Sequence, residues 1–410
     1  MTGRIRMPGR GGAGAALAAS LLLVLGCGNN VSSGGGSGGK GGFGGAGGRG
    51  GSGGIGGVGG GGIGGGGGGG NPDGSAGGCT GSGLPINANY DQWTWVAFPE
   101  TRCGLGAAPT GIGINPTQRS SNLLLFMMGG GACYDAQTCQ PAPPAQPKAA
   151  HLGGYAASEF NQDVMFALGA GTLFDRSAAE NPFRDWSFVF IPYCTGDFHS
   201  GSRTSATSYG VWHVGFSNMA AYLNRLAPTF CNRVQRIVLA GSSAGGWGTL
   251  FNYAQVEAAF GGRRVDLVDD SGPAMTPQYM SLQSTMMAAW GSAQNLPPGC
   301  TGCASGWQGL FPYLGSTYPS HHFALVSSYW DQVIGPFFGL NTPQAMQRGL
   351  NDLADNVVVP LANWRVYFIA SNQHVWLGPA FISTSSAGVP LTTFIDQEIT
   401  DSAAWSNVRP

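Results

Sequence analysis

The sequence Arg-Ile-Val-Leu-Ala-Gly-Ser-Ser-Ala-Gly-Gly occupies residues 236–246 and joins an apolar run to a G-x-S-x-G turn. The run Arg236–Ala240 is short and rich in branched side chains, which favours a buried strand of a parallel sheet. The residues Ala244–Phe260 that follow have helix-forming composition. In such a strand–turn–helix the backbone of the serine is strained, so the residues on either side of it must be small. The N-terminus of the helix directs N–H groups towards the negative charge that develops on a substrate bound at the serine. We therefore predict that Ser243 is a nucleophile; a serine that only forms the turn is the alternative.

Apolar runs of strand length alternate with helix-like stretches from about Asp91 onward. This alternation predicts an α/β fold with a mostly parallel central sheet flanked by helices. An antiparallel hairpin of Trp93–Phe98 and Thr110–Ile114 is expected at the sheet edge. The other expected strands are Leu123–Met128, Trp186–Ile191, Arg236–Ala240, Val265–Val268, Phe323–Val326 and Arg365–Ile369, and the expected helices are Val211–Leu226, Ala244–Phe260 and Pro343–Leu353.

A run of glycines follows the expected strand Leu123–Met128 and leads into Ala132 and Cys133. Glycine lets backbone N–H groups approach a reacting group closely, as an oxyanion hole requires. We expect the oxyanion donors among Gly130, Gly131 and Ala132 on this loop, together with the N–H of Ala244. A glycine turn that serves only to reach Cys133 is the alternative.

A serine nucleophile needs a base and an acid, which in this motif order follow it along the chain. Of the six histidines, only His374 comes after the last expected strand, so we assign the base to it. Asp331 follows the strand Phe323–Val326 and is the favoured acid, because its carboxylate would fix the imidazole tautomer. Asp269 and Asp270, which follow the preceding strand, are the competing acids.

The composition excludes several classes of function. The net charge is −1, only 10% of residues are charged, and no Lys/Arg run occurs beyond the first few arginines, so no nucleic-acid partner is expected. No apolar stretch reaches the roughly 18–20 residues of a membrane-spanning helix, so a soluble body is expected. Of the 73 glycines, 32 lie in residues 28–78, where the lack of apolar side chains predicts a flexible linker.

The N-terminus has the layout of an export signal. Arg4, Arg6 and Arg10 precede an apolar stretch, which ends at Cys27 and is too short for a stable membrane anchor. The residues before Cys27 resemble a bacterial lipobox, so we expect lipid on that cysteine; an ordinary cleaved signal is the alternative. Gly28 after the cysteine favours the outer membrane or cell surface over the inner membrane. The expected parts are the signal 1–26, the lipidated cysteine and linker 27–78, and a catalytic domain 79–410.

Eight cysteines remain when Cys27 is set aside. In an exported chain an even number implies disulfides, although eight cysteines permit 105 pairings. Short spacings favour Cys133 with Cys139 and Cys300 with Cys303; half of a zinc site is the alternative for the second pair. This second pair lies in a long segment, about 272–320, which is expected to be a disulfide-pinned insertion, either a lid or a surface excursion.

These motifs, in this order, resemble those of the pectin acetylesterase and Notum family of α/β-hydrolases. The resemblance covers most of residues 91–410 and implies an α/β-hydrolase-type sheet. It also implies a carboxylester hydrolase with Ser243, Asp331 and His374 as triad and with neither metal nor other cofactor. The residues that carry it are Trp93–Val96, Cys103-Gly104, Pro109–Gly111, Gly129–Tyr134 with Cys139, Ile191–Asp197, Gly241–Gly246 and Asp270–Gly272.

Some features leave the substrate open. Tyr134 and Asp197 lie on family-like loops and are candidates for the substrate pocket, although capping of its own loop is the alternative for Asp197. His374 lacks the flanking cysteines of the plant-like members. Between Asp270 and Asp331 no substrate-defining residue is recognisable, so the resemblance transfers the chemistry better than the substrate.

The leading hypothesis is an exported serine esterase that removes acetyl or short acyl groups from a polysaccharide or glycan. It would be a monomer that contacts a membrane only through lipid on Cys27. One alternative is an esterase for longer acyl chains, lipidated proteins or polyesters. Another is a surface binding protein that uses a hydrolase scaffold without turnover.

Overall fold

The computed structural model describes residues 78–166 and 168–410. The expected export signal, Cys27 and the glycine-rich tract up to residue 77 lie outside the described residues. Within the described part, no helix is both long and apolar enough to cross a membrane.

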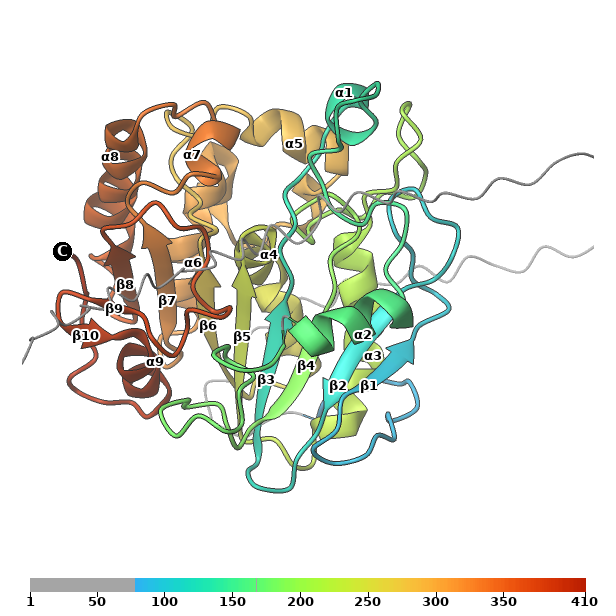
Figure 1. The fold of residues 1–410 in the computed structure, drawn as a ribbon, viewed down its shortest axis with the longest axis vertical. Helices are drawn as coiled ribbons and strands as arrows, with labels where there is room; N and C mark the ends of the chain where they lie inside the picture. Colours follow the sequence, from blue (N-terminus) through green and yellow to red (C-terminus); the bar gives the residue numbers. More distant parts are fainter. Residues whose placement is uncertain (1–77, 167) are drawn as a thin grey trace, which may run out of the picture.

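A mixed sheet of eight strands forms the centre of the described fold (Figure 1). Its order is β1-β2-β4-β3-β5-β6-β7-β8, and all neighbours from β4 to β8 run parallel, whereas β1 and β2 are antiparallel at one edge. The strands are β1 Thr94–Ala97, β2 Gly111–Asn115, β3 Asn122–Met127, β4 Ser187–Ile191, β5 Arg236–Ser242, β6 Arg264–Asp270, β7 Phe323–Ser328 and β8 Trp364–Ile369, with a small separate hairpin of β9 Ser385–Ser386 and β10 Val389–Pro390.

The mostly parallel sheet and its antiparallel edge confirm the predicted fold class. Each predicted strand is present, and its ends differ from the prediction by at most two residues. The parallel strands are buried almost throughout because helices cover both faces, which is why they read as continuous apolar runs.

The register of the central strands brings their carboxyl ends to one edge. Gly241 of β5 pairs with Met127 of β3, and Ser242 pairs with Asp270 of β6. In open α/β sheets this edge is where ligands bind. The G-x-S-x-G turn and the glycine run therefore leave neighbouring strands side by side.

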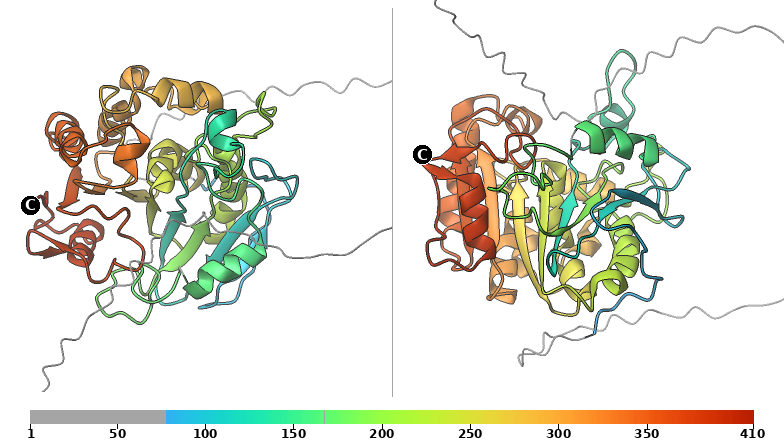
Figure 2. Two further views of the ribbon diagram at one scale, coloured as in Figure 1. Left: turned by 45° about the horizontal axis from the view of Figure 1, so that its top comes forward. Right: turned by 60° about the horizontal axis from the view of Figure 1, so that its bottom comes forward.

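Helices lie on both faces of the sheet. Helix α4 packs on β5, β6 and α3, whereas α2 lies on the opposite face, over β4 and β2 (Figures 1 and 2). The helices are α1 Ala136–Cys139, α2 Ala157–Phe166, α3 Gly215–Phe230, α4 Ala244–Ala259, α5 Gln283–Trp290, α6 Leu310–Thr317, α7 Ile334–Phe337, α8 Pro343–Leu353 and α9 Leu391–Ile399.

The prediction of a helix over Val211–Leu226 was wrong at both ends. Helix α3 begins only at Gly215 because the Asp197 carboxylate accepts the Gly215 N–H at 2.8 Å. It then continues through Pro228 to Phe230, whose ring is buried. A charge from a distant loop and burial of the last turn thus override the local composition.

All eight cysteines in the described part form disulfides. The two pairs expected from spacing, Cys133–Cys139 and Cys300–Cys303, are present. The long-range pairs are Cys79–Cys231 and Cys103–Cys194, which spacing alone could not select. The insertion therefore carries a disulfide as predicted, and it contains α5, α6 and three short 3₁₀ turns.

Substitution of Leu239 tests how much the packing of β5 contributes to the stability of the fold. It is fully buried in β5, so Leu239→Ala removes buried surface and leaves a cavity. We expect the free energy of unfolding to fall by about 2–5 kcal/mol in urea titrations. Leu84 is 80% exposed, and Leu84→Ala should change it by less than about 0.5 kcal/mol. Equal effects of the two substitutions would contradict this packing.

Candidate active site

Ser243 lies at the sharp turn between β5 and α4. Its φ and ψ are 58° and −121°, a left-handed conformation that a non-glycine residue rarely adopts. The turn closes only because Gly245 is small: a Cβ there would lie 1.9 Å from the Met127 carbonyl oxygen. Helix α4 starts at Ala244, so its N-terminus is directed at the space beside Ser243. The local geometry is thus the strained strand–turn–helix that the sequence predicts.

The glycine run after β3 lies directly beside this turn. A Cβ on Gly129 would stand 2.9 Å from the Cβ of Ser243. Gly129, Gly130 and Gly131 line the same cavity as Ser243, whereas Ala132 is fully buried and is not among the residues that line it. Of the candidate donors on this loop, Gly130 and Gly131 are therefore better placed than Ala132 to reach a group bound in the cavity.

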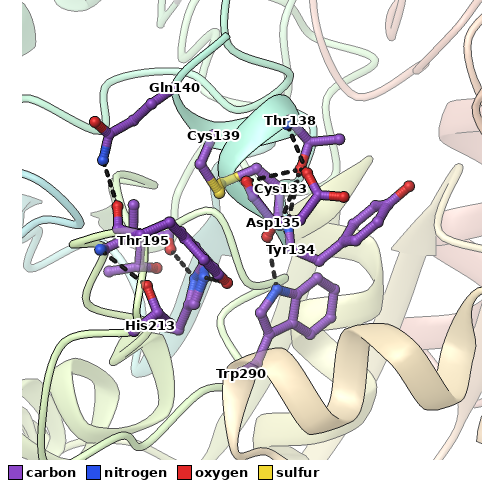
Figure 3. Close-up of a disulfide and its surroundings, with 12 residues drawn as sticks. Cys133, Tyr134, Asp135, Thr138, Cys139, Gln140, Thr195, His213 and Trp290 are labelled. Atoms are coloured by element: carbon purple, nitrogen blue, oxygen red, sulfur yellow. Dashed lines mark hydrogen bonds between the residues drawn. A yellow bond between two sulfur atoms is a disulfide. The ribbon is translucent and has the colours of Figure 1, made fainter.

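The loop that follows the glycines is held rigid from three sides (Figure 3). The Cys133–Cys139 disulfide closes it, and the Asp135 carboxylate caps α1 by accepting the Thr138 N–H at 2.7 Å. From the insertion, the Trp290 indole donates to the Cys133 carbonyl at 2.8 Å. The insertion thus supports the loop that follows the glycines through this hydrogen bond.

His374 lies on the loop after β8 and pairs with Asp331. The His374 Nδ1 is 2.7 Å from the Asp331 Oδ2. The other Asp331 oxygen accepts the N–H groups of Val333 and Ile334 at 2.8 and 2.9 Å, so the carboxylate is fully satisfied. With Nδ1–H donated to Asp331, the other nitrogen of His374 is left as an acceptor, and His374 lines the same cavity as Ser243.

Asp270 has a different position from Asp331, although sequence reasoning left it as a competing acid. Its Oδ2 accepts the Ser242 hydroxyl at 2.7 Å and the N–H groups of Trp376 and Leu377 at 2.8 and 3.0 Å. It therefore ties the nucleophile strand to the loop that carries His374. The sequence analysis did not identify this contact, although a hydroxyl at the end of one strand and a carboxylate at the end of the next were visible in the sequence.

Asp269, the other competitor, is fully buried and accepts the Gly272 N–H at 2.8 Å. Its second oxygen has no hydrogen-bond partner within the described part of the chain. Burial raises the pKa of this carboxyl well above its usual range, with a further contribution from Asp270. A carboxyl whose charged form is disfavoured by burial does not match the ionised acid that a histidine base needs.

A cavity of about 370 Å³ opens beside Ser243 and His374. Exposed Gln146 and Lys148 also contribute to its lining. Inside, the wall is mostly apolar, with side chains from β3, β4 and the residues after α2, namely Phe126, Met128, Leu168, Leu173, Phe174 and Phe190. Sequence patterns missed this surface because each of these residues also reads as ordinary core.

The two candidate pocket residues are not among the residues that line this cavity. Asp197 is fully buried and its carboxylate accepts from Thr195 Oγ1, Gly201 N and Gly215 N, so it caps its own loop, the alternative that the sequence left open. Tyr134 is partly exposed on the disulfide loop.

One group of potential metal ligands occurs in the described residues, formed by Cys133, Cys139 and His213. The two sulfurs are joined in the disulfide. Both ring nitrogens of His213 are within hydrogen-bond reach of other groups, Nδ1 at 2.8 Å from the Thr195 carbonyl and Nε2 at 3.0 Å from the Tyr209 hydroxyl. This group is therefore part of the loop scaffold.

Comparison with known proteins identifies relatives. The pectinacetylesterase family model matches residues 100–335, which include Ser243 and Asp331 but not His374. Palmitoleoyl-protein carboxylesterase notum2 of Xenopus laevis is 30% identical over 35% of this chain and 28% of its own length. Pectin acetylesterase 11 of Arabidopsis thaliana is 24% identical over 55% of this chain and 58% of its own length. The chain thus spans between about a quarter and three fifths of these relatives.

A solved structure shares the fold. The Wnt deacylase Notum from Drosophila aligns with a TM-score of 0.55 and 18% identity, over 78% of this chain and 96% of that one. This likeness supports the α/β-hydrolase architecture that the sheet order indicates.

The raised pKa of Asp269 predicts a pH effect on stability. The folded protein holds the Asp269 proton more tightly than the unfolded chain, which releases it above about pH 4, so the contribution of this group to stability falls as pH rises from there. Asp269→Asn keeps an acceptor for Gly272 but removes this titration, so its urea midpoint should decline less between about pH 4 and pH 7 than that of the wild type. The urea midpoint of Asp396→Asn, a substitution at an exposed position, should decline over this pH range as much as that of the wild type. If the urea midpoint of Asp269→Asn declined as steeply as that of the wild type, the raised pKa of Asp269 would be refuted.

Proposed function

The chain belongs to the pectinacetylesterase family, and we propose that it is an exported serine esterase that acts through Ser243, His374 and Asp331. The observation that carries the proposal is the 2.7 Å contact between His374 Nδ1 and Asp331 Oδ2 on the wall of the cavity that Ser243 also lines. A nucleophile, a base and a group that orients the base are the parts that acyl transfer requires.

The proposed reaction has two halves. Ser243 Oγ attacks the ester carbonyl while His374 Nε2 takes its proton, and the imidazolium then protonates the departing alcohol as the C–O bond breaks. Water next attacks the acyl-enzyme, gives its proton to His374, and Ser243 regains a proton as the acid leaves. Asp331 holds the Nδ1–H tautomer and stabilises the imidazolium in both halves.

Backbone groups would stabilise the oxyanion that forms in each half. Ala244 is the first residue of α4, next to Ser243, and Gly130 and Gly131 line the same cavity. Donors held in place before the reaction need no reorganisation when charge develops, so each is worth about 2.7–4 kcal/mol of barrier.

The size of the cavity indicates which acyl groups it can hold. Sequence analysis favoured acetyl or short acyl groups, with longer chains as the alternative. An apolar volume of about 370 Å³ is much larger than an acetyl group needs, and it supports the alternative: an acyl chain of medium length or longer. The relatives act on both extremes according to their names, one on palmitoleoyl groups of proteins and one on acetylated pectin.

The disulfides indicate the kind of compartment in which the protein would be located. Four disulfides in the described part suit an oxidising compartment, in agreement with the export signal predicted at residues 1–26. In this proposal lipid on Cys27 holds the protein at the outer surface, residues 27–78 are the linker, and residues 79–410 are the catalytic domain.

Ser243→Ala tests the nucleophile. We expect kcat for p-nitrophenyl esters to fall by roughly 10⁶-fold, because the hydroxyl that forms the acyl-enzyme is removed, and labelling by a fluorophosphonate probe to disappear. Ser316→Ala, at an exposed position away from the cavity, serves as the matched control and should retain both. Wild-type protein that neither labels nor turns over any ester would instead support a binding protein.

A series of p-nitrophenyl esters tests the acyl assignment. Each methylene buried in the cavity contributes about 0.8 kcal/mol, so kcat/KM should rise up to about fourfold per methylene from acetyl towards octanoyl. A maximum at acetyl with a steep decline beyond butyryl would restore the short-acyl hypothesis.

A further inference from the structure

One acidic side chain interrupts the apolar wall of the cavity. Asp163, on α2, lines it although the residue is only 8% exposed. Its Oδ2 accepts a hydrogen bond from the Tyr155 hydroxyl. The mechanism gives this carboxyl no role, and a desolvated carboxyl is costly in an apolar wall unless a polar partner faces it.

The hydrogen bond to Tyr155 places Asp163 on the β4 side of the cavity. The Tyr155 ring packs 6.3 Å from Phe190 on β4 and 5.8 Å from Trp95 on β1. Ser243 follows β5, and the sheet order is β4-β3-β5. Because neighbouring strands are about 4.8 Å apart, the β4 side lies roughly 10 Å from the nucleophile.

Asp163 gives the cavity a polar group, whereas the rest of the inner wall is mostly apolar. Burial raises the pKa of Asp163, and nearby Glu159 raises it further against the opposing effect of the Tyr155 hydroxyl. A carboxyl accepts a hydrogen bond from a hydroxyl in either protonation state. The rings that line the same cavity, such as Phe126 and Phe190, offer no such partner.

We propose that Asp163 forms a polar subsite for the far end of the acyl chain, so that the preferred substrates are esters of hydroxylated acyl groups. This inference rests on the proposed esterase function. An extended chain with carbon–carbon bonds of about 1.5 Å advances about 1.25 Å per carbon, so a span of roughly 10 Å corresponds to a hydroxyl near carbon 8. A plain alkyl end would instead leave the desolvated carboxyl facing hydrocarbon.

The experiment compares kcat/KM for p-nitrophenyl octanoate, 8-hydroxyoctanoate and 3-hydroxyoctanoate. The wild-type enzyme should prefer the 8-hydroxy ester to octanoate by roughly tenfold, because a buried polar group left unpaired is costly. It should not prefer the 3-hydroxy ester, whose hydroxyl would lie near the start of the chain. No preference for the 8-hydroxy ester would overturn the proposal without any variant.

Two substitutions separate recognition from structural support. Asp163→Leu should reverse the preference, with faster turnover of octanoate and slower turnover of the 8-hydroxy ester. Tyr155→Phe removes the hydroxyl partner but keeps the carboxyl, so the preference should persist. If Asp163 only supports Tyr155, both variants lose activity on all esters by the same factor and the ratio stays at the wild-type value, which would also overturn the proposal.

The outcome for the proposed function can be read separately. Hydrolysis that survives Ser243→Ala would reject the esterase mechanism itself. Hydrolysis that depends on Ser243 but has the same ester ratio in wild type and in Asp163→Leu would reject only the subsite. Urea midpoints of each variant establish that it is folded before rates are compared.

Discussion

The carboxylate of Asp270 joins the parts on which the site depends. It accepts from Ser242 on one side and from Trp376 and Leu377 on the other. The Ser243 turn and the His374 loop are separated by more than 120 residues, and no strand pairing connects β5 to β8 directly. Because the carboxylate is buried, its hydrogen bonds are strong and their loss would be costly. Asp331 orients the imidazole, but Asp270 fixes the loop that brings it there.

Motifs with a local physical cause were predictable from sequence. The strand–turn–helix around Ser243 follows from small residues behind a branched apolar run, and the parallel strands follow from burial on both faces. The pairings of Cys133 with Cys139 and of Cys300 with Cys303 follow from short spacing. In each case the residues that decide the structure are close neighbours in the sequence, such as the two cysteines six positions apart in Cys133–Cys139.

Features that arise from tertiary contact were not predictable. The sequence favoured Asp331 over Asp269 and Asp270 as the partner of His374, but it left all three open because each ends or follows a parallel strand, and only the path of the chain determines which carboxylate meets His374. The start of α3 depends on Asp197, a residue 18 positions earlier. The cavity beside Ser243 depends on rings from β3 and β4, whose sequence pattern is the same as that of ordinary core residues.

The Cys79–Cys231 disulfide determines how the body of the protein bears a mechanical load from its N-terminal side. Cys79 stands before the edge strand β1, and the bond joins it to the end of α3. Tension on the chain that precedes Cys79 therefore passes covalently into a helix packed on α4. It does not act on the edge strand, whose hydrogen bonds could otherwise be broken one pair at a time. The hairpin of β1 and β2 thus bears no share of a pull that a surface attachment would impose.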